Sequence, residues 1–427
     1  MSKQIIKNEF IGEELVKITH ESGLQVYVMK KNYTGAYAVF GTRYGSCDNE
    51  FTLDGERISV PEGIAHFLEH KMFETEDGQD TFELFAQIGA DANAYTSTDR
   101  TAYLFSCTED FYQAFEILIN MVLTPVFTKE NVAKEQGIIA QEIKMCSDRP
   151  TDALHYNLMK AMYATNPVGI PIAGTVESIA KITPELLYKC YNAFYRMNNM
   201  AICVCGNVDP DQIERIIERM IPKDKKTEVA FTPINDCPAV NQKLITTKAQ
   251  ISRPLFSIGI KHPEGNSETM CACEVLSEAL FGEGEDFFSE LYEGELVNKF
   301  RAYYEYGRSA NFFGITGDSL EPQQVMDKLC LLAQKVKKEG VQRDAFERAK
   351  RNIYADILRS FDASEDIAEG MFDAFLSNER FLDSAEAFHA VTYEQVNDLA
   401  KLVLNEERFC MSVVYPLDNG SGGKENA

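Results

Sequence analysis

Long apolar runs, a secretory leader and paired cysteine motifs are all missing from this 427-residue chain. No stretch of 18 apolar residues occurs, so we expect no transmembrane helix and no membrane partner. The first ten residues hold no apolar segment followed by a small-residue cleavage site, so we expect no secretory signal. The eleven cysteines form no C-x-x-C pair, which favours reduced thiols and a cytoplasmic location.

Basic residues are also scarce, because 42 lysines and arginines face 66 aspartates and glutamates, for a net charge of −24. An excess of negative charge repels phosphate backbones and argues against a nucleic-acid partner. If part of this charge lines a cavity, it would attract cationic or neutral peptides, whereas the alternative is that it serves solubility. A hydrophobic content of 45% and a length sufficient for two to four domains describe a globular protein with sizeable cores.

Histidine is rare too, with six in the chain, yet two of them fall in the five-residue segment His66-Phe67-Leu68-Glu69-His70. This H-x-x-E-H pattern is an inverted form of the zinc-peptidase signature. On a helix, positions i and i+4 place both imidazoles side by side, with Glu69 next to them. Two neutral imidazoles can bind Zn²⁺, and the carboxylate can accept a proton from an attacking water. The alternative is a helix whose two histidines merely pack or face solvent.

The residues around this segment favour the metal site. Ile64, Ala65, Met72 and Phe73 are apolar, so the three polar groups are expected to be at least half buried. A buried His-Glu-His cluster without a partner would be costly, and a bound metal removes that cost.

A tetrahedral zinc needs a third protein ligand, and the segment 128–144 offers candidates. Its apolar spacing predicts a helix. Glu135 and Glu142 are seven residues apart and therefore lie on the same helical face. The alternative for this pair is an ordinary solvated acidic face.

An H-x-x-E-H helix followed about seventy residues later by E-x6-E resembles the pitrilysin/insulinase family of zinc metallopeptidases, which includes mitochondrial processing peptidase. The resemblance implies that His66, His70 and Glu142 bind one Zn²⁺ per chain. It also implies that Glu69 is the general base and that Glu135 supports catalysis from behind the metal ligands.

The segment 92–96, Ala-Asn-Ala-Tyr-Thr, resembles the edge-strand hairpin with which this family receives the substrate backbone. The resemblance therefore implies that Asn93 and Ala94 bind substrate. In the C-terminal half the chain departs from the family, because Tyr292 and Lys299 stand where an arginine and a tyrosine are expected. A homologous partner subunit that supplies this pair, or a homodimer, is the expected consequence.

The order of predicted elements suggests a duplicated unit, in which strands are followed by helices in each half. The predicted strands cover 24–29, 36–41, 92–107, 199–206, 250–261, 303–317 and 410–415, and the predicted helices cover 81–87, 111–123, 152–164, 210–221, 269–281, 322–339, 343–360 and 364–377. We therefore expect an α+β fold of two homologous α/β lobes, each an antiparallel-rich sheet flanked by helices, as in the processing peptidases.

The expected boundaries are a zinc-binding catalytic lobe at 1–228, a linker at 229–245, a lobe without metal at 246–418 and a disordered tail at 419–427. The function that these features imply is a zinc-dependent endopeptidase acting on peptides or unfolded segments. The alternative is a non-catalytic subunit that binds peptides or assembles with a processing peptidase. The complete set of ligands and base favours the enzyme, since a scaffold has no use for it.

Overall fold

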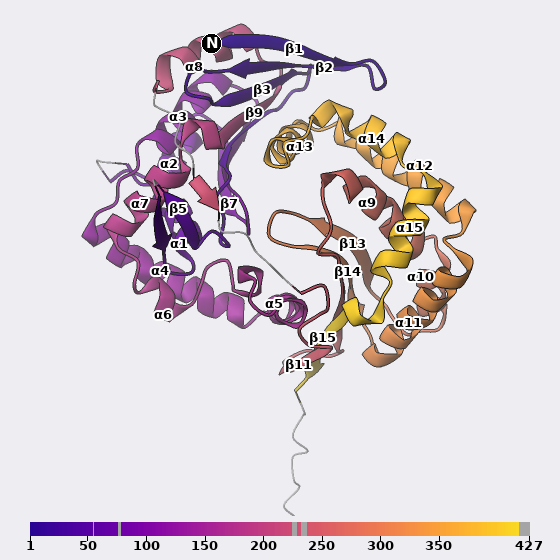
Figure 1. The fold of residues 1–427 in the computed structure, drawn as a ribbon. Helices are drawn as coiled ribbons and strands as arrows, with labels where there is room; N and C mark the ends of the chain where they lie inside the picture. The colour runs from indigo at the N-terminus through magenta and orange to yellow at the C-terminus, as the bar shows by residue number, and fades with distance from the viewer. Residues whose placement is uncertain (54, 76–77, 224–228, 232–236, 418–427) are drawn as a thin grey trace, which may run out of the picture.

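The chain forms two lobes, each built on one mixed β-sheet, as seen in a computed structural model that describes residues 1–417 except 54, 76–77, 224–228 and 232–236 (Figure 1). The N-terminal sheet has seven strands in the order β1-β2-β3-β9-β4-β8-β7, and the C-terminal sheet has five in the order β11-β15-β12-β14-β13. The strands of these two sheets are β1 (Ser2–Asn8), β2 (Glu13–Thr19), β3 (Gln25–Lys30), β4 (Ala36–Thr42), β7 (Asp91–Thr96), β8 (Thr101–Cys107), β9 (Met200–Gly206), β11 (Leu244–Ala249), β12 (Leu255–Lys261), β13 (Phe300–Tyr306), β14 (Asn311–Asp318) and β15 (Phe409–Pro416). A small third sheet consists of β10 (Val229–Phe231), β5 (Glu50–Leu53) and β6 (Glu56–Ser59).

The two large sheets share one pairing pattern. A parallel pair, β3 with β9, is followed by β4, β8 and β7 in antiparallel order. In the other lobe the parallel pair β11 with β15 is followed by β12, β14 and β13, again antiparallel. The predicted α+β fold with antiparallel-rich sheets in two lobes is thus confirmed.

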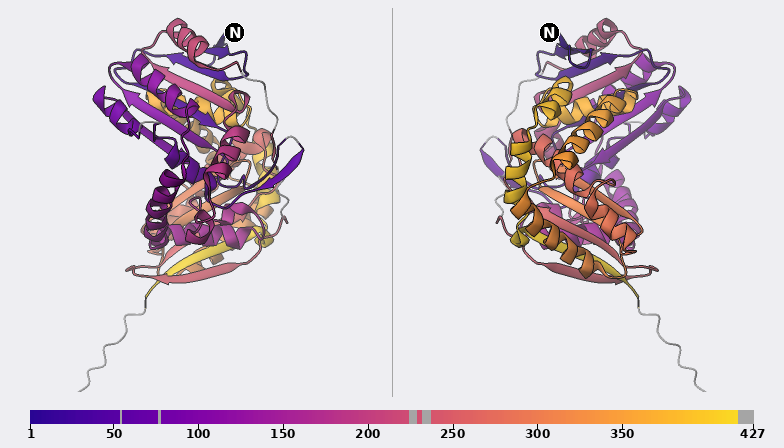
Figure 2. Two further views of the ribbon diagram at one scale, coloured as in Figure 1. Left: turned by 90° about the vertical axis from the view of Figure 1, so that its left-hand side faces the viewer. Right: turned by 90° about the vertical axis from the view of Figure 1, so that its right-hand side faces the viewer.

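Helices surround both sheets, and those of the C-terminal lobe lie in front of its sheet when that lobe faces the viewer (Figure 2, right). The helices are α1 (Ile64–Lys71), α2 (Thr81–Gln87), α3 (Phe111–Leu123), α4 (Lys129–Ser147), α5 (Pro150–Met162), α6 (Val176–Ile179), α7 (Pro184–Phe194), α8 (Pro210–Met220), α9 (Ser267–Phe281), α10 (Asp286–Glu293), α11 (Pro322–Glu339), α12 (Arg343–Ser360), α13 (Ser364–Leu376), α14 (Ser384–Ala390) and α15 (Tyr393–Val403). The predicted helices agree with α2, α3, α5, α8, α9, α11, α12 and α13 to within a few residues. The elements that were not predicted are helices α6, α7, α10, α14 and α15 and strands β1, β2, β5, β6, β10 and β11.

One helix of each lobe packs on the sheet of the other lobe. Helix α13 of the C-terminal lobe packs on β3, β9 and β4, and helix α5 of the N-terminal lobe packs on the equivalent strands β11, β15 and β12. Alternation along β4 explains how both faces are buried: Ala38 and Phe40 point into the N-terminal core, whereas Tyr37 and Val39 point to the face under α13. Gly41 permits the close approach, because a Cβ atom there would lie 2.1 Å from the Phe372 ring of α13.

Several predicted boundaries stay predictions. Strand β10 and the start of β11 lie inside the range predicted as a linker, and the predicted tail at 419–427 lies outside the described residues. The eleven cysteines form no disulfide. Among the described residues, none of the helices combines the length and the apolar character that crossing a membrane requires.

Candidate metal centre

Helix α1 begins at a position that only glycine fits well. Gly63 has φ 87°, and a Cβ atom on it would lie 2.4 Å from the carbonyl oxygen of Ala173. The backbone at Gly63 therefore packs directly against the backbone near residue 173. This contact fixes where the first turn of α1 starts, and with it the position of His66.

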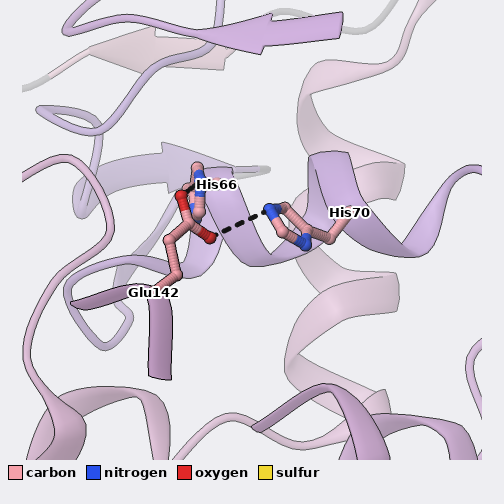
Figure 3. A group of neighbouring side chains, drawn as sticks. All are labelled: His66, His70 and Glu142. Atoms are coloured by element: carbon pink, nitrogen blue, oxygen red, sulfur yellow. Dashed lines mark ion pairs between the residues drawn. The ribbon is translucent and has the colours of Figure 1, made fainter. Parts of the chain in front are cut away.

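The two motif histidines and Glu142 converge at one point, with the Glu142 carboxylate from α4 facing both imidazole rings of α1 (Figure 3). Glu142 Oε1 lies 3.6 Å from His66 Nε2, and Glu142 Oε2 lies 3.5 Å from His70 Nε2. Each of the three residues offers a ligand atom within 4.8 Å of the others. The structure thus brings together the three groups that the sequence predicted as ligands.

These distances fit a zinc ion. Bonds of about 2.0–2.2 Å in a tetrahedral site separate the ligand atoms by about 3.4 Å. The donor set of two imidazoles and one carboxylate is that of several catalytic zinc sites, in which a fourth position stays open. The residues present therefore fit the metal that the motif predicts.

Electrostatics keep the Glu142 carboxylate charged. The interaction with His66 lowers the pKa of Glu142, and it outweighs burial, which acts in the opposite direction. A deprotonated carboxylate is the form that a divalent cation requires.

Glu69 lies on the same helix and is nine-tenths buried. Burial raises the pKa of the Glu69 carboxyl, although the two imidazoles and the Thr96 hydroxyl act in the opposite direction. The Thr96 hydroxyl donates a hydrogen bond to Glu69 Oε2 at 3.0 Å. A buried carboxyl with a raised pKa beside a metal site has the properties of a proton acceptor in catalysis.

Glu135 forms a hydrogen bond with the imidazole of His70, the second histidine of the motif. His70 Nδ1 donates to Glu135 Oε1 at 3.1 Å, which leaves Nε2 free to face Glu142. Burial lowers the pKa of His70, but the hydrogen bond with Glu135 and the nearby carboxylates outweigh it, so the pKa is raised. A carboxylate on the far nitrogen of a metal-ligating histidine fixes its tautomer and orientation.

The ammonium of Lys71 lies against the same carboxylate. Lys71 is fully buried, pairs with Glu74 and lies 3.5 Å from Glu135 Oε2. The pKa of Glu135 is lowered, because the hydrogen bond with His70 and the charge of Lys71 outweigh burial. The sequence analysis gave Lys71 no role, since one lysine after a motif carries no spacing signal of its own.

The two histidines differ in the hydrogen bonding of their Nδ1 atoms. His66 Nδ1 is buried and has no hydrogen-bond partner among the described residues, whereas His70 Nδ1 has Glu135. His66 is therefore oriented by packing and by Glu142, and His70 by a chain of charged groups.

Helix α4 supplies both glutamates because its start is well defined. Thr128 and Asn131 form a reciprocal capping box, in which each side chain accepts from the other residue's backbone N–H. With the register set there, Glu135 and Glu142 face α1 two turns apart, and the two helices are in contact. The predicted shared face is what the structure shows.

Strand β7 forms the open edge of the N-terminal sheet, since it pairs with β8 alone. Ser97 donates its N–H to Arg100 across the hairpin, whereas the Ala94 N–H is bonded to the side-chain oxygen of Asn93 at 2.9 Å. Because alternate residues of an edge strand point their backbone groups outward, Ala94 presents its N–H to the free side. Asn93 and Ala94 also line a cavity of about 380 Å³ together with Glu69 and His70.

The C-terminal positions that depart from the family are also seen. Tyr292 lies on α10 with 57% of its surface exposed, and Lys299 directly precedes β13. Tyr292 therefore stands where the resemblance requires an arginine, and Lys299 where it requires a tyrosine.

Sequence and structure comparisons place this arrangement among known proteins. A profile described as Insulinase (Peptidase family M16) matches residues 59–176, and one described as Peptidase M16 inactive domain matches 181–353. The "Uncharacterized zinc protease YmfH" of Bacillus subtilis is 36% identical over 96% of this chain and 99% of its own length. The beta subunit of mitochondrial-processing peptidase from Caenorhabditis elegans is 25% identical over 96% of this chain and 91% of its own.

A solved structure agrees with the sequence relatives. The M16-like peptidase from Alicyclobacillus acidocaldarius superposes with a TM-score of 0.91 at 33% identity, over 96% of this chain and all of that one. The similarity therefore extends over both lobes and includes the helices that carry His66, His70 and Glu142. The chain belongs to the insulinase-type peptidase family M16.

Proposed function

We propose that this chain is a zinc-dependent endopeptidase that hydrolyses peptides or unfolded segments. The observation that carries the proposal is the convergence of His66, His70 and Glu142 beside the buried carboxyl of Glu69. The names of the bacterial relatives, which are zinc proteases, support the same metal and reaction.

The metal and the protein have separate tasks in this proposal. His66, His70 and Glu142 would hold a zinc ion, which when bound would supply a Lewis acid that lowers the pKa of a water molecule and polarises the carbonyl of the scissile peptide bond. Glu69 accepts the proton of the attacking water and passes it to the departing amine. Thr96 keeps the Glu69 carboxylate aligned, and Glu135 keeps His70 aligned.

Substrate binding is assigned to the free edge of β7. An extended peptide that pairs with this edge gains backbone hydrogen bonds with little demand on its sequence. The outward N–H of Ala94 donates to the Asn93 side-chain oxygen, and we assign it to the substrate backbone once the peptide displaces that oxygen. This placement brings the bound peptide past Glu69 and His70, which line the same cavity.

A second candidate function rests on Tyr292 and Lys299. Because these residues replace the arginine and tyrosine that the resemblance requires, the chain would either need a homologous partner or a second copy, or serve as a non-catalytic binding subunit. We also propose a cytoplasmic location, and two homologous units at 1–228 and 246–418.

The test is a metal and activity measurement on the purified full chain. We expect about one zinc per chain by mass spectrometry, and hydrolysis of a quenched fluorescent peptide library that 1,10-phenanthroline abolishes and added zinc restores. Glu142→Ala should lose both, whereas Glu130→Ala, an exposed glutamate of the same helix, should keep both. A zinc-loaded chain that binds peptides but hydrolyses none, alone or with a homologous partner, would favour the second candidate.

A further inference from the structure

A carboxylate of the C-terminal lobe is bonded to the strand that borders the metal centre. Glu369 lies on α13, which packs against the N-terminal sheet (Figure 1). Tyr95 of β7 donates its hydroxyl to Glu369 Oε2 at 2.8 Å, and Tyr37 of β4 donates to Oε1 at 3.0 Å. Both oxygens of one glutamate are therefore engaged by tyrosines from the other lobe.

The residue after Tyr95 touches the proposed base. Neighbouring side chains on a strand point to opposite faces, so Tyr95 points to α13 and Thr96 points to α1. On that side the Thr96 hydroxyl donates to Glu69 Oε2 at 3.0 Å. Two consecutive residues of β7 thus connect Glu369 in one lobe with Glu69 in the other.

Helix α13 also holds the turn of the same hairpin. Asp373 follows Glu369 by four residues, so both side chains lie on one helical face. Asp373 pairs with Arg100, and Arg100 Nε lies 3.0 Å from Asp99 Oδ1. The hairpin is therefore fixed by α13 at two places, Tyr95 and the turn at Arg100.

Fixation from outside matters because β7 has one neighbour in its sheet. An edge strand with a single partner has fewer restraints on its twist and register than an internal strand. We propose, on the basis of the proposed peptidase function, that Glu369 is a positioning residue that holds Tyr95 so that Thr96 stays aligned on Glu69. The C-terminal lobe thereby takes part in the reaction although it supplies no ligand to the proposed metal site.

A purely structural role for Glu369 gives a different expectation. The lobes are also joined by Phe372 against Gly41, and by Arg43, whose guanidinium lies 3.9 Å from the centre of the Phe375 ring. The bond from Tyr37 to Glu369 is chemically the same as that from Tyr95, but β4 carries none of the proposed site residues. Tyr37→Phe is therefore a matched control for Tyr95→Phe.

Amide hydrogen exchange of the zinc-loaded chain tests whether Glu369 and Tyr95 restrain strand β7. We expect Tyr95→Phe and Glu369→Gln to speed amide exchange across residues 91–96 about ten-fold relative to Tyr37→Phe, because β7 then opens more often. Equal exchange in Tyr95→Phe and Tyr37→Phe would overturn the proposal. This readout does not depend on whether the chain hydrolyses peptides, so it separates the positioning role from the proposed function.

Steady-state kinetics test whether Tyr95 affects Glu69 through Thr96. Tyr95→Phe should lower kcat about ten-fold with KM within about two-fold, since a small displacement of an aligned catalytic group has effects of this size. If the effect passes through Thr96, the kcat of the double variant Tyr95→Phe/Thr96→Val should lie within about two-fold of the kcat of Thr96→Val. Additive losses, or a loss in Tyr37→Phe equal to that in Tyr95→Phe, would show that Glu369 only joins the lobes.

Discussion

Helices α1 and α9 occupy the same place in their two lobes but carry different chemistry. Each is the first helix after the strand that has an antiparallel neighbour on either side: α9 directly follows β12, and α1 follows β4 after the short strands β5 and β6. Helix α1 presents His66, Glu69 and His70, whereas α9 contains no histidine and is lined by apolar residues and cysteines. The comparison shows that the topology provides a site for a helix, and that side chains alone decide whether the helix can hold a metal.

The buried acids of these two helices differ in the same way. Glu69 lies beside two imidazoles and a hydroxyl, which oppose the rise in its pKa that burial causes. On α9, burial raises the pKa of Glu274 to about 7, and the charge of Glu379 adds to the rise. An acid that faces another acid tends to stay protonated, whereas an acid among imidazoles can exchange its proton.

The largest expected effect separates these two glutamates. Glu69→Gln should lower kcat by about 10²- to 10⁴-fold, the usual contribution of general acid–base catalysis, while zinc content stays the same. Glu274→Gln, the matched change on α9, should leave turnover within about two-fold. Peptide hydrolysis and metal analysis of both variants test this. Retained turnover in zinc-loaded Glu69→Gln would remove the distinction between the two helices.

A smaller effect is expected from the group behind His70. Glu135→Ala removes the acceptor of the His70 N–H bond and should weaken zinc binding about 10- to 100-fold. Competition with a chromophoric chelator measures this change, with Glu130→Ala on the same helix as control. An unchanged zinc affinity would mean that packing and Glu142 are enough to orient His70, as they are for His66, whose Nδ1 has no partner among the described residues.

Glu274 of the C-terminal lobe should make the free energy of unfolding depend on pH. Because the folded-state pKa of Glu274 is raised from 4.5 to about 7, the folded chain keeps a proton that the unfolded chain releases in this range. The free energy of unfolding should therefore fall as pH rises from about 5 to 8, by about 1–2 kcal/mol for this group, given its partial exposure.

Urea unfolding of the natural chain and of Glu274→Gln at pH 5 and pH 8 isolates this contribution. The variant should lose less stability across that range, by the amount assigned to Glu274. Equal losses in both proteins would show that Glu274 is charged in the folded state, so that α9 resembles α1 more closely than we infer.

The helical faces of the metal centre were predictable from sequence because their spacings are local, whereas the meeting of α1 with α4 and the choice of Glu142 as third ligand came from the resemblance to a known family. Two histidines four residues apart and two glutamates seven residues apart share helical faces wherever their helices lie. The link from Glu369 to Tyr95 was not predictable, because it joins residues from different lobes and no periodicity connects them. Helix α13 itself was predicted at nearly its true bounds, but its partner, the face of the other lobe's sheet, was not. Strand β1 was missed because most of its side chains are exposed and show no alternation.

The smallest expected effect concerns Tyr292, the residue at the position where the resemblance implies an arginine. Tyr292 is 57% exposed, and its ring centre lies 5.6 Å from that of Phe288 on the same helix, so few contacts hold its side chain in place. Tyr292→Ala should therefore leave kcat/KM within about two-fold, as for most exposed substitutions. Peptide hydrolysis at several substrate concentrations measures this, with Tyr415→Ala on β15 as an exposed control. A ten-fold loss confined to Tyr292→Ala would mean that the C-terminal lobe contacts substrate directly, and its part in the reaction would then exceed the positioning of β7.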